Sequence, residues 1–165
     1  SRALLEFTRP VGVHAPCWSS RALLEYKNRT LQHSYRRAHN QSMQNESCPI
    51  CTAHQQIEPL QEGEHWILRL AESAKNCPGY LYLEPRAHIE SFAQISPPAW
   101  TEFGSMMQSG MQTIQQNWNP RKIYVAVISE AVPHIHFHLV PRHTDESKGF
   151  DYLRSALEGR LPARE

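Results

Sequence analysis

The stretch Pro133-His134-Ile135-His136-Phe137-His138-Leu139-Val140-Pro141 decides the fold expected of this chain. Successive side chains of an extended backbone point to opposite faces, so three alternate histidines line one side of this segment and apolar residues the other. Random placement of the ten histidines would produce only about 0.04 such triplets in the whole chain. The pattern therefore predicts a strand over 133–141 with one packed face and one reactive face.

A strand face made of histidine suits nucleophilic chemistry near neutral pH. A neutral imidazole has a free nitrogen lone pair, and an ordinary pKa of about 6.5 leaves much of it neutral at pH 7. A second imidazole about 7 Å away along the strand can orient the nucleophile, bond phosphate oxygens or assist a leaving group. A phosphorus centre is a suitable target. A half-exposed strand whose polar positions happen to be histidine is the alternative.

The segments around this strand predict an α+β fold. Residues 63–70 and 80–83 are expected to be strands, with Trp66, Leu68 and Leu70 alternating along the first. A helix is expected from Ser96 to about Asn119, followed by a strand over 123–128, and a last helix near 152–159. The helix stripe expected in the core comprises Trp100, Phe103, Met106, Met107, Met111 and Ile114. This order predicts an antiparallel sheet with the long helix packed on one face.

The chain of 165 residues is expected to hold one domain with additions at both ends. Residues 1–47 carry seven Lys or Arg against three Glu and little apolar periodicity, so they are interpreted as an N-terminal extension. Within it, residues 20–37 are expected to form a helix, with an irregular segment that lies over the domain as the alternative. The domain is expected to span residues 48–143, and residues 144–165 form a charged C-terminal tail.

The charge balance points to a small-molecule partner. A formal charge of +1 supplies no global field for nucleic acid or an anionic membrane, and no apolar run approaches the roughly 18 to 20 residues of a membrane helix. We therefore expect no membrane or nucleic-acid partner. Four cysteines without a secretory leader favour a reducing, cytoplasmic compartment, with organellar targeting by the arginine-rich start as the alternative.

The segment Cys48-Pro49-Ile50-Cys51 supports more than one reading. A Cys-x-x-Cys turn supplies two thiolates to a zinc ion, which needs four ligands in a structural site. The same spacing occurs in thioredoxin-like dithiols, which normally lie between a strand and a helix, whereas residues 38–47 are polar and not strand-like. Two unliganded cysteines are the third reading.

The histidine segment resembles the motif of the histidine-triad (HIT) family, His-x-His-x-His followed by two apolar residues. The match runs from Pro133 to Arg142, and residues 79–90 resemble the strand, basic turn and histidine found upstream in that family. The resemblance covers about residues 48–143. It implies a homodimer with a continuous sheet and activity on nucleotides, as a hydrolase or a nucleotidyl transferase.

The resemblance also implies roles for individual residues. His136 would attack the α-phosphorus of a dinucleoside polyphosphate or nucleoside phosphoramidate, and a nucleotidyl-histidine intermediate would form. His138 would bond the phosphate or leaving group, and His134 would support the nucleophile or bind metal. Ser129 and Arg142 are the expected substrate-binding residues.

A zinc-bearing branch of the family implies the remaining metal ligands. There the histidine after the basic turn and the first triad histidine complete the site, which makes the expected structural zinc ligands here Cys48, Cys51, His88 and His134. With four protein ligands such a site has no open position for catalysis.

One departure from the family pattern concerns the phosphate site. Many members have a Gly-Gln-Ser-like or Gly-Gln-Thr-like segment before the triad, where this chain has Ser129-Glu130-Ala131-Val132. Ser129 would replace that polar helper only in part. The departure keeps a second hypothesis open, a zinc-stabilised nucleotide-binding or interaction module without turnover.

Overall fold

A computed structural model describes residues 45–162 of the chain, and its centre is an antiparallel sheet. The strands are β1 (Gln61–Glu62), β2 (Trp66–Leu70), β3 (Leu81–Pro85), β4 (Lys122–Ala126) and β5 (Phe137–Arg142). They lie in the order β1-β2-β3-β5-β4, so β5 is flanked on both sides while β4 is at an edge. Leu81 of β3 pairs with Leu139 of β5, and Leu83 pairs with Phe137.

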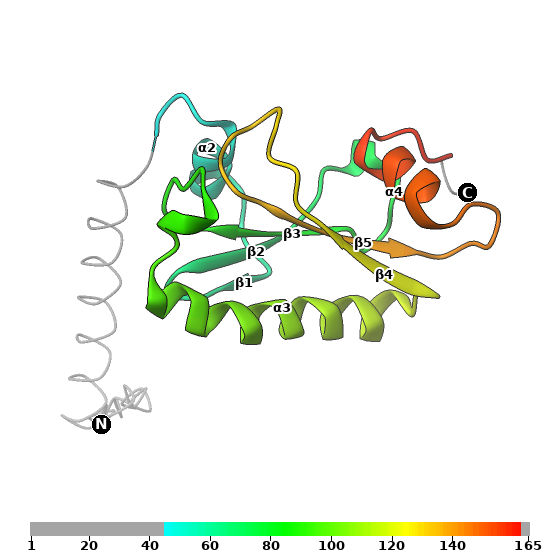
Figure 1. Ribbon diagram of the computed structural model, residues 1–165. Helices are drawn as coiled ribbons and strands as arrows, with labels where there is room; N and C mark the ends of the chain where they lie inside the picture. The colour runs from blue at the N-terminus through cyan, green and yellow to red at the C-terminus, as the bar shows by residue number, and fades with distance from the viewer. Residues whose placement is uncertain (1–44, 163–165) are drawn as a thin grey trace, which may run out of the picture. The chain divides into compact units, whose positions relative to one another are not determined.

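The long helix α3 (Pro97–Trp118) covers one face of this sheet (Figure 1). The Ser96 side chain caps its start by accepting a hydrogen bond from the backbone N–H of Ala99, and Asn119 ends it in the left-handed conformation. The buried core between helix and sheet comprises Trp66, Leu68, Leu81, Leu83, Ile95, Ala99, Met106, Ile114, Ile135, Phe137 and Leu139. Burial of this apolar surface is the main force that holds the domain together.

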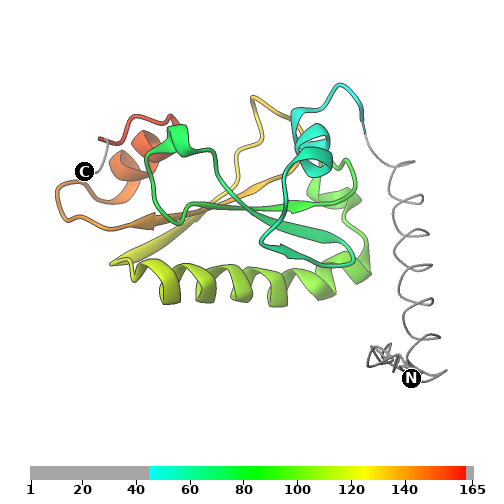
Figure 2. The same ribbon diagram turned by 180° about the vertical axis from the view of Figure 1, so that it is seen from behind.

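Two shorter helices lie on the opposite face of the sheet, at its two ends (Figures 1 and 2). Helix α2 (Pro49–Gln56) buries Ile50 and Cys51, with Cys48 as its N-cap residue. Helix α4 (Gly149–Leu157) buries Tyr152 and Ala156 in a cluster with Tyr82 and Val140 of the sheet and with Tyr80, which precedes β3. The short 3-10 turns η1 (Ser73–Lys75) and η2 (Phe92–Gln94) complete the described elements.

The predicted α+β class and its antiparallel sheet with one long helix are confirmed. One expected core position is wrong: Trp100 is 43% exposed, stacked on Phe92. In the expected strand, Leu70 is 44% exposed while its neighbour Arg69 is buried. Helix α2 was not predicted, because a Cys-x-x-Cys segment was interpreted as a turn; Pro at its first position starts the helix.

The strand predicted over 133–141 begins four residues later than expected, at Phe137, so His134 and His136 precede β5. The physical reason is the extent of pairing: β4 ends at Ala126, opposite His138, and β3, although it continues to Pro85, pairs with β5 only as far as Leu83, opposite Phe137. The alternation continues nonetheless, since Ile135 is buried in the core with Phe137. A hydrogen bond of 2.7 Å from the Ile135 N–H to the carbonyl of Ile89 supports the segment before the strand.

The predicted last helix corresponds to α4, which starts three residues earlier than expected. The helix predicted over 20–37 and nearly all of the expected extension lie outside the described residues. Among residues 45–162, none of the helices combines the length and hydrophobicity that crossing a membrane requires.

Candidate functional site

The three histidines of the motif lie on the sheet face opposite α3. His134 is fully buried, His136 is half-buried and His138 is 8% exposed. The rings of His136 and His138 are adjacent, with centroids 4.6 Å apart. His134 instead turns toward α2, where it meets a separate group of side chains. The triad is thereby divided between two environments.

The structure brings together the four residues expected to bind metal. The ligand atoms of Cys48, Cys51, His88 and His134 all lie within 4.8 Å of one another. Nδ1 of His134 is 3.6 Å from Sγ of Cys48 and 3.5 Å from Sγ of Cys51, and Nδ1 of His88 is also 3.5 Å from Sγ of Cys51. Helix α2 supplies the two thiols, and the segments after β3 and before β5 supply the imidazoles.

These distances fit a tetrahedral zinc site. Bonds of about 2.3 Å to sulfur and 2.0 Å to nitrogen place neighbouring ligand atoms about 3.5 Å apart around zinc. The tautomers fit as well, because Nε2 of His134 donates to the carbonyl of Pro85 at 2.9 Å and Nε2 of His88 donates to Glu90 at 3.0 Å. Each bond leaves an Nδ1 lone pair directed to the cluster. Burial also lowers the pKa of His134 to about 4, which favours the neutral, ligating form.

The hydrogen bonds of His136 specify which of its nitrogens is free. Its Nδ1 lies 2.8 Å from the backbone carbonyl of His134. A carbonyl only accepts hydrogen bonds, so Nδ1 carries the hydrogen and Nε2 carries the lone pair. Ser129, with a left-handed φ of 53°, places its Oγ 3.5 Å from the same Nδ1 and accepts the His136 backbone N–H at 3.4 Å.

His138 has a different partner. Its Nδ1 lies 2.6 Å from the hydroxyl of Tyr80, a residue that immediately precedes β3. Burial lowers the pKa of His138 to about 3, so its ring is neutral at physiological pH. The ring of Tyr82 lies beside both His136 and His138, with centroids 6.1 and 5.4 Å away.

A buried polar network lies next to the triad, and the sequence analysis did not identify it. The carboxylate of Glu84 accepts two hydrogen bonds of 2.9 Å from Arg69 and another of 2.9 Å from Nε2 of His54. The guanidinium of Arg69 lies 4.5 Å from the ring centroid of Tyr82. The signal in the sequence is one charged residue of each sign, Arg69 and Glu84, among mostly apolar strand residues. Only the register shows that they meet: Arg69 pairs with Tyr82, and Glu84, two residues further along β3, is on the same face as Tyr82.

We expect Glu84→Gln to lower the free energy of unfolding by about 3–5 kcal/mol at pH 7, because Arg69 would stay buried without its counter-charge. Burial alone would raise the pKa of Glu84, but hydrogen bonds from His54 and Arg69 outweigh it and hold that pKa below its ordinary value. The stabilisation is therefore present above the unfolded pKa and is lost as pH falls through the lower folded value. Urea denaturation at pH 7 and in acid measures both effects.

Glu72→Gln is the matched control, because Glu72 pairs with the same Arg69 but its side chain is 54% exposed. Such exposed pairs contribute about 0–1 kcal/mol. Equal losses in the two variants, or a Glu84→Gln effect that does not change with pH, would contradict the assignment.

Of the two expected substrate-binding residues, the structure brings only Ser129 to the triad. Arg142 ends β5, six residues or about 20 Å beyond His136. Its guanidinium donates to Asp145 at 2.8 Å and also to the carbonyl of Thr144.

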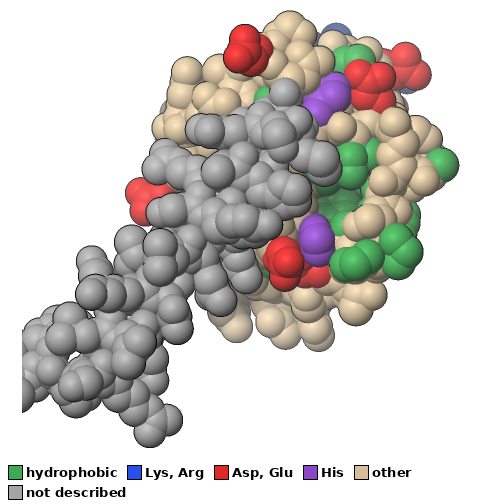
Figure 3. Space-filling model, turned by 90° about the vertical axis from the view of Figure 1, so that its left-hand side faces the viewer, with side chains coloured by type: hydrophobic (Ala, Val, Ile, Leu, Met, Phe, Trp, Pro, Cys, Tyr) green, Lys and Arg blue, Asp and Glu red, His purple; other side chains and the backbone are tan. Residues whose placement is uncertain are grey.

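Figure 3 shows the surface on the left-hand side of Figure 1, where histidine side chains lie beside acidic and hydrophobic ones.

Comparison with known proteins agrees with the motif. The sequence model of the HIT domain matches residues 56–145, which is more than half of the chain. No curated protein sequence matches the chain significantly. The matched region includes the three triad histidines and His88, while the two cysteines precede it.

Solved structures of low sequence identity share the fold. A HIT family protein from Bacillus anthracis is 19% identical, with a TM-score of 0.53, over 70% of this chain and 92% of that one. A HIT family member from Bacillus subtilis is 19% identical, with a TM-score of 0.52, over 72% of this chain and all of that one. A Zn-bound histidine triad protein from Mycobacterium smegmatis is 19% identical, with a TM-score of 0.51, over 69% and 91% of the two chains.

Proposed function

Because this chain belongs to the histidine-triad (HIT) family, we propose that it is a nucleotide hydrolase, or a nucleotidyl transferase, that acts at the α-phosphate of its substrate. The proposed substrates are a dinucleoside polyphosphate or a nucleoside phosphoramidate. The observation that carries the proposal is the 2.8 Å bond between Nδ1 of His136 and the carbonyl of His134, because it puts the hydrogen on Nδ1 and the lone pair on Nε2, which has no hydrogen-bond partner among residues 45–162.

The proposed reaction has two displacements at phosphorus. In the first, Nε2 of His136 bonds to the α-phosphorus while the bond from phosphorus to the leaving oxygen or nitrogen breaks, and the leaving group takes up a proton from solvent. In the second, a water oxygen bonds to phosphorus, the bond to Nε2 breaks, and the proton of water goes to solvent. The products are a nucleoside monophosphate and free His136.

The other residues of the site support these steps. His138 bonds the phosphate or the leaving group, and Ser129 supplies a hydroxyl beside the nucleophile. Displacement at phosphorus depends mainly on positioning and charge stabilisation, so the fixed orientation of these groups matters as much as the nucleophile. Arg142 is not included in the proposed phosphate site, because Asp145 already binds it.

Release of AMP tests this proposal. Full-length protein is incubated with diadenosine tetraphosphate or adenosine 5′-phosphoramidate, and AMP is quantified against a no-protein blank. Turnover of either compound supports the enzyme, and the preferred compound identifies the leaving group. Binding of AMP with turnover of neither compound supports the second hypothesis, a nucleotide-binding module. That hypothesis is favoured by the exposed Glu130, an acidic residue in the segment where many family members have a polar helper.

We propose that the ligand cluster described above holds a structural zinc ion, with Cys48, Cys51, His88 and His134 as ligands. When bound, the metal would neutralise the thiolates and fix the segment before β5, without an open position for water. His134 then has two functions: its side chain binds the metal and its backbone carbonyl orients His136.

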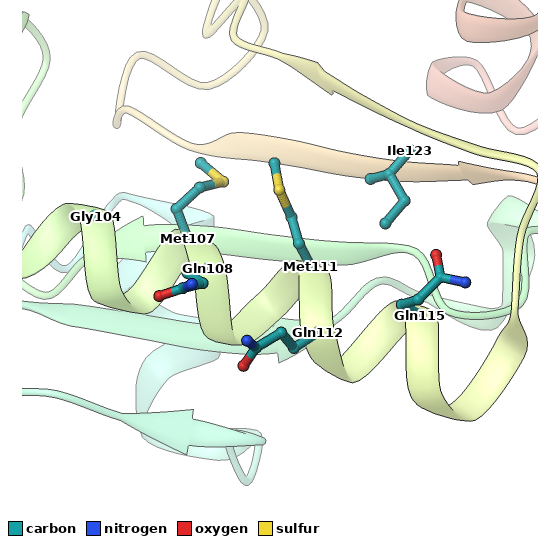
Figure 4. Close-up of a pocket in the computed structure, with 7 residues that line it drawn as sticks. All are labelled: Gly104, Met107, Gln108, Met111, Gln112, Gln115 and Ile123. Atoms are coloured by element: carbon teal, nitrogen blue, oxygen red, sulfur yellow. The ribbon is translucent and has the colours of Figure 1, made fainter.

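We also propose that the chain forms a homodimer through the β4 edge and the neighbouring surface of α3. A groove of about 560 Å³ lies there, between α3 and Ile123 of β4 (Figure 4). Met107 and Met111 line the groove. Val125 of β4 is on the same sheet face, because it pairs with Leu139, which belongs to the core beneath α3, and its side chain is 43% exposed. An edge strand beside exposed apolar residues is suited to pairing with a second copy.

We expect Val125→Lys to convert the dimer to a monomer, because the pairing would bury a lysine charge without a partner. Light scattering coupled to size-exclusion chromatography measures the mass in solution. Phe150→Lys is the control, since Phe150 is 89% exposed on α4, away from this groove, and its replacement should leave the mass unchanged. A monomeric wild type, or a dimer that tolerates Val125→Lys, would contradict this interface.

A further inference from the structure

The hydroxyl of Tyr80 and the ring of His138 form a buried pair, in which Tyr80 has no role in the proposed reaction so far described. The oxygen lies 2.6 Å from Nδ1 of His138, and the two residues are only 1% and 8% exposed. This bond occupies Nδ1, so Nε2 is the nitrogen of His138 that remains for a substrate. The role of His138 therefore depends on which partner holds the shared hydrogen.

Burial limits this pair to one arrangement of charge. It raises the pKa of Tyr80 well above the ordinary value, and it lowers the pKa of His138 to about 3. Both groups are consequently neutral at physiological pH, with one hydrogen on the phenol and one on the imidazole. Because a phenol O–H is the better donor and an imidazole nitrogen the better acceptor, Tyr80 donates to Nδ1 and the imidazole hydrogen is on Nε2.

Helix α4 encloses this pair. Tyr152 and Ala156 of α4 are buried in the same cluster as Tyr80, and the Tyr152 hydroxyl donates to the carbonyl of Pro141 at 2.8 Å. Figure 1 shows α4 above the end of the sheet where β5 runs beneath it. This helix follows residue 145, where the match to the HIT domain ends. The C-terminal segment thus contributes the burial that keeps water from competing for the Tyr80 hydroxyl.

We propose that Tyr80 is a positioning residue that holds His138 as the Nε2–H tautomer. The inference rests on the proposed function, because its purpose is to give the transferring phosphate a hydrogen-bond donor next to the nucleophile. The carbonyl of His134 leaves a lone pair on Nε2 of His136, and Tyr80 leaves a hydrogen on Nε2 of His138. Two lone pairs side by side would repel the phosphate oxygens, whereas one lone pair and one donor can attack and stabilise together.

The tautomer of His138 is directly measurable in the full-length wild-type protein. Long-range ¹H–¹⁵N correlation spectra of uniformly ¹⁵N-labelled protein distinguish protonated from unprotonated ring nitrogens, and the signals lost in His138→Gln identify the residue. We expect unprotonated Nδ1 and protonated Nε2. A protonated Nδ1 in the wild type would overturn the proposal. Since no substrate is used, this result is independent of whether the protein turns over nucleotides.

Kinetics test the consequence of that tautomer. In Tyr80→Phe we expect a mixture of His138 tautomers and a fall in kcat of about tenfold with adenosine 5′-phosphoramidate, while KM changes less than about twofold. Tyr152→Phe is the matched control: it removes a hydroxyl bond from the same cluster without touching His138, so kcat should stay within about twofold of wild type. Equal kcat values in wild type and folded Tyr80→Phe protein would also overturn the proposal.

Discussion

His136→Ala protein is expected to release AMP from adenosine 5′-phosphoramidate at least about 10⁴-fold more slowly than wild type, a loss of about 5.5 kcal/mol of transition-state stabilisation. The variant has no nitrogen to form the covalent intermediate, and the remaining site contributes only binding and hydrogen bonds. Its fold should persist, because His136 is half-buried on the open face and contributes no side chain to the core beneath α3. Steady-state AMP release measures the effect.

His143→Ala is the control for this prediction, because it removes a histidine beyond the far end of β5, where Nε2 bonds the carbonyl of Pro78. Its AMP release should stay within about twofold of wild type. Rapid quenching in base during turnover should further trap a nucleotidyl adduct on the wild type that His136→Ala lacks, because the phosphorus–nitrogen bond is stable in base. Comparable turnover by both proteins would exclude His136 as the nucleophile and with it the proposed reaction.

The alternation of histidine and apolar residues is sufficient to predict which side chains of this segment face the core and which lie on the histidine face. It depends only on the geometry of an extended chain, and Ile135 and Phe137 are buried as that geometry requires. The start of β5 was not predictable in the same way. A strand extends only as far as its neighbours pair with it, and the pairing of Leu83 and Ala126 with β5 follows from the register of the whole sheet.

The roles of the individual site residues are only partly predictable from the sequence. The resemblance implied that His88 and His134 complete the ligand set begun by two cysteines, and the structure places all four together. Tyr80 was interpreted only as the start of a strand, because nothing in a Tyr-Leu-Tyr-Leu run distinguishes an outward tyrosine from one that bonds a histidine 58 residues away. Arg69 and Glu84 pose the same problem, since long-range pairing decides whether a charge can be buried.

The geometry of His134 links the metal cluster to the proposed chemistry. Its Nε2–H and Nδ1 connect β3 to the cysteines at the start of α2, while its carbonyl holds the Nδ1–H of His136, the proposed nucleophile. A shift of the segment before β5 would therefore move the carbonyl that fixes the tautomer of His136. In this arrangement the stability of the cluster and the orientation of the nucleophile are coupled through a single residue.

Removal of the proposed zinc should destabilise the protein strongly. We expect purified wild type to carry about one equivalent of zinc per chain, and Cys51→Ser to lose it, because the serine hydroxyl is a poor ligand and Cys51 lies within 3.5 Å of both histidine ligand atoms. Structural zinc contributes about 10–16 kcal/mol in zinc-finger peptides, and even half of the lower value would lower Tm by at least about 10 °C for a domain of this size. Metal analysis and thermal unfolding followed by circular dichroism measure the two effects.

Cys77→Ser is the control that distinguishes the effect of losing the metal from the effect of replacing a cysteine that is not a ligand. Cys77 is half-buried, outside the four-residue cluster, and its Sγ lies 3.3 Å from the carbonyl of Pro141. This variant should keep its zinc and unfold within a few degrees of wild type. Chelation of the wild type should reproduce the Tm of Cys51→Ser, and added zinc should restore only the chelated wild type. If the wild type contains no zinc and its Tm changes with neither chelator nor added metal, the buried cysteines and histidines hold α2 without an ion. A disulfide between Cys48 and Cys51 in that protein would then support the redox interpretation.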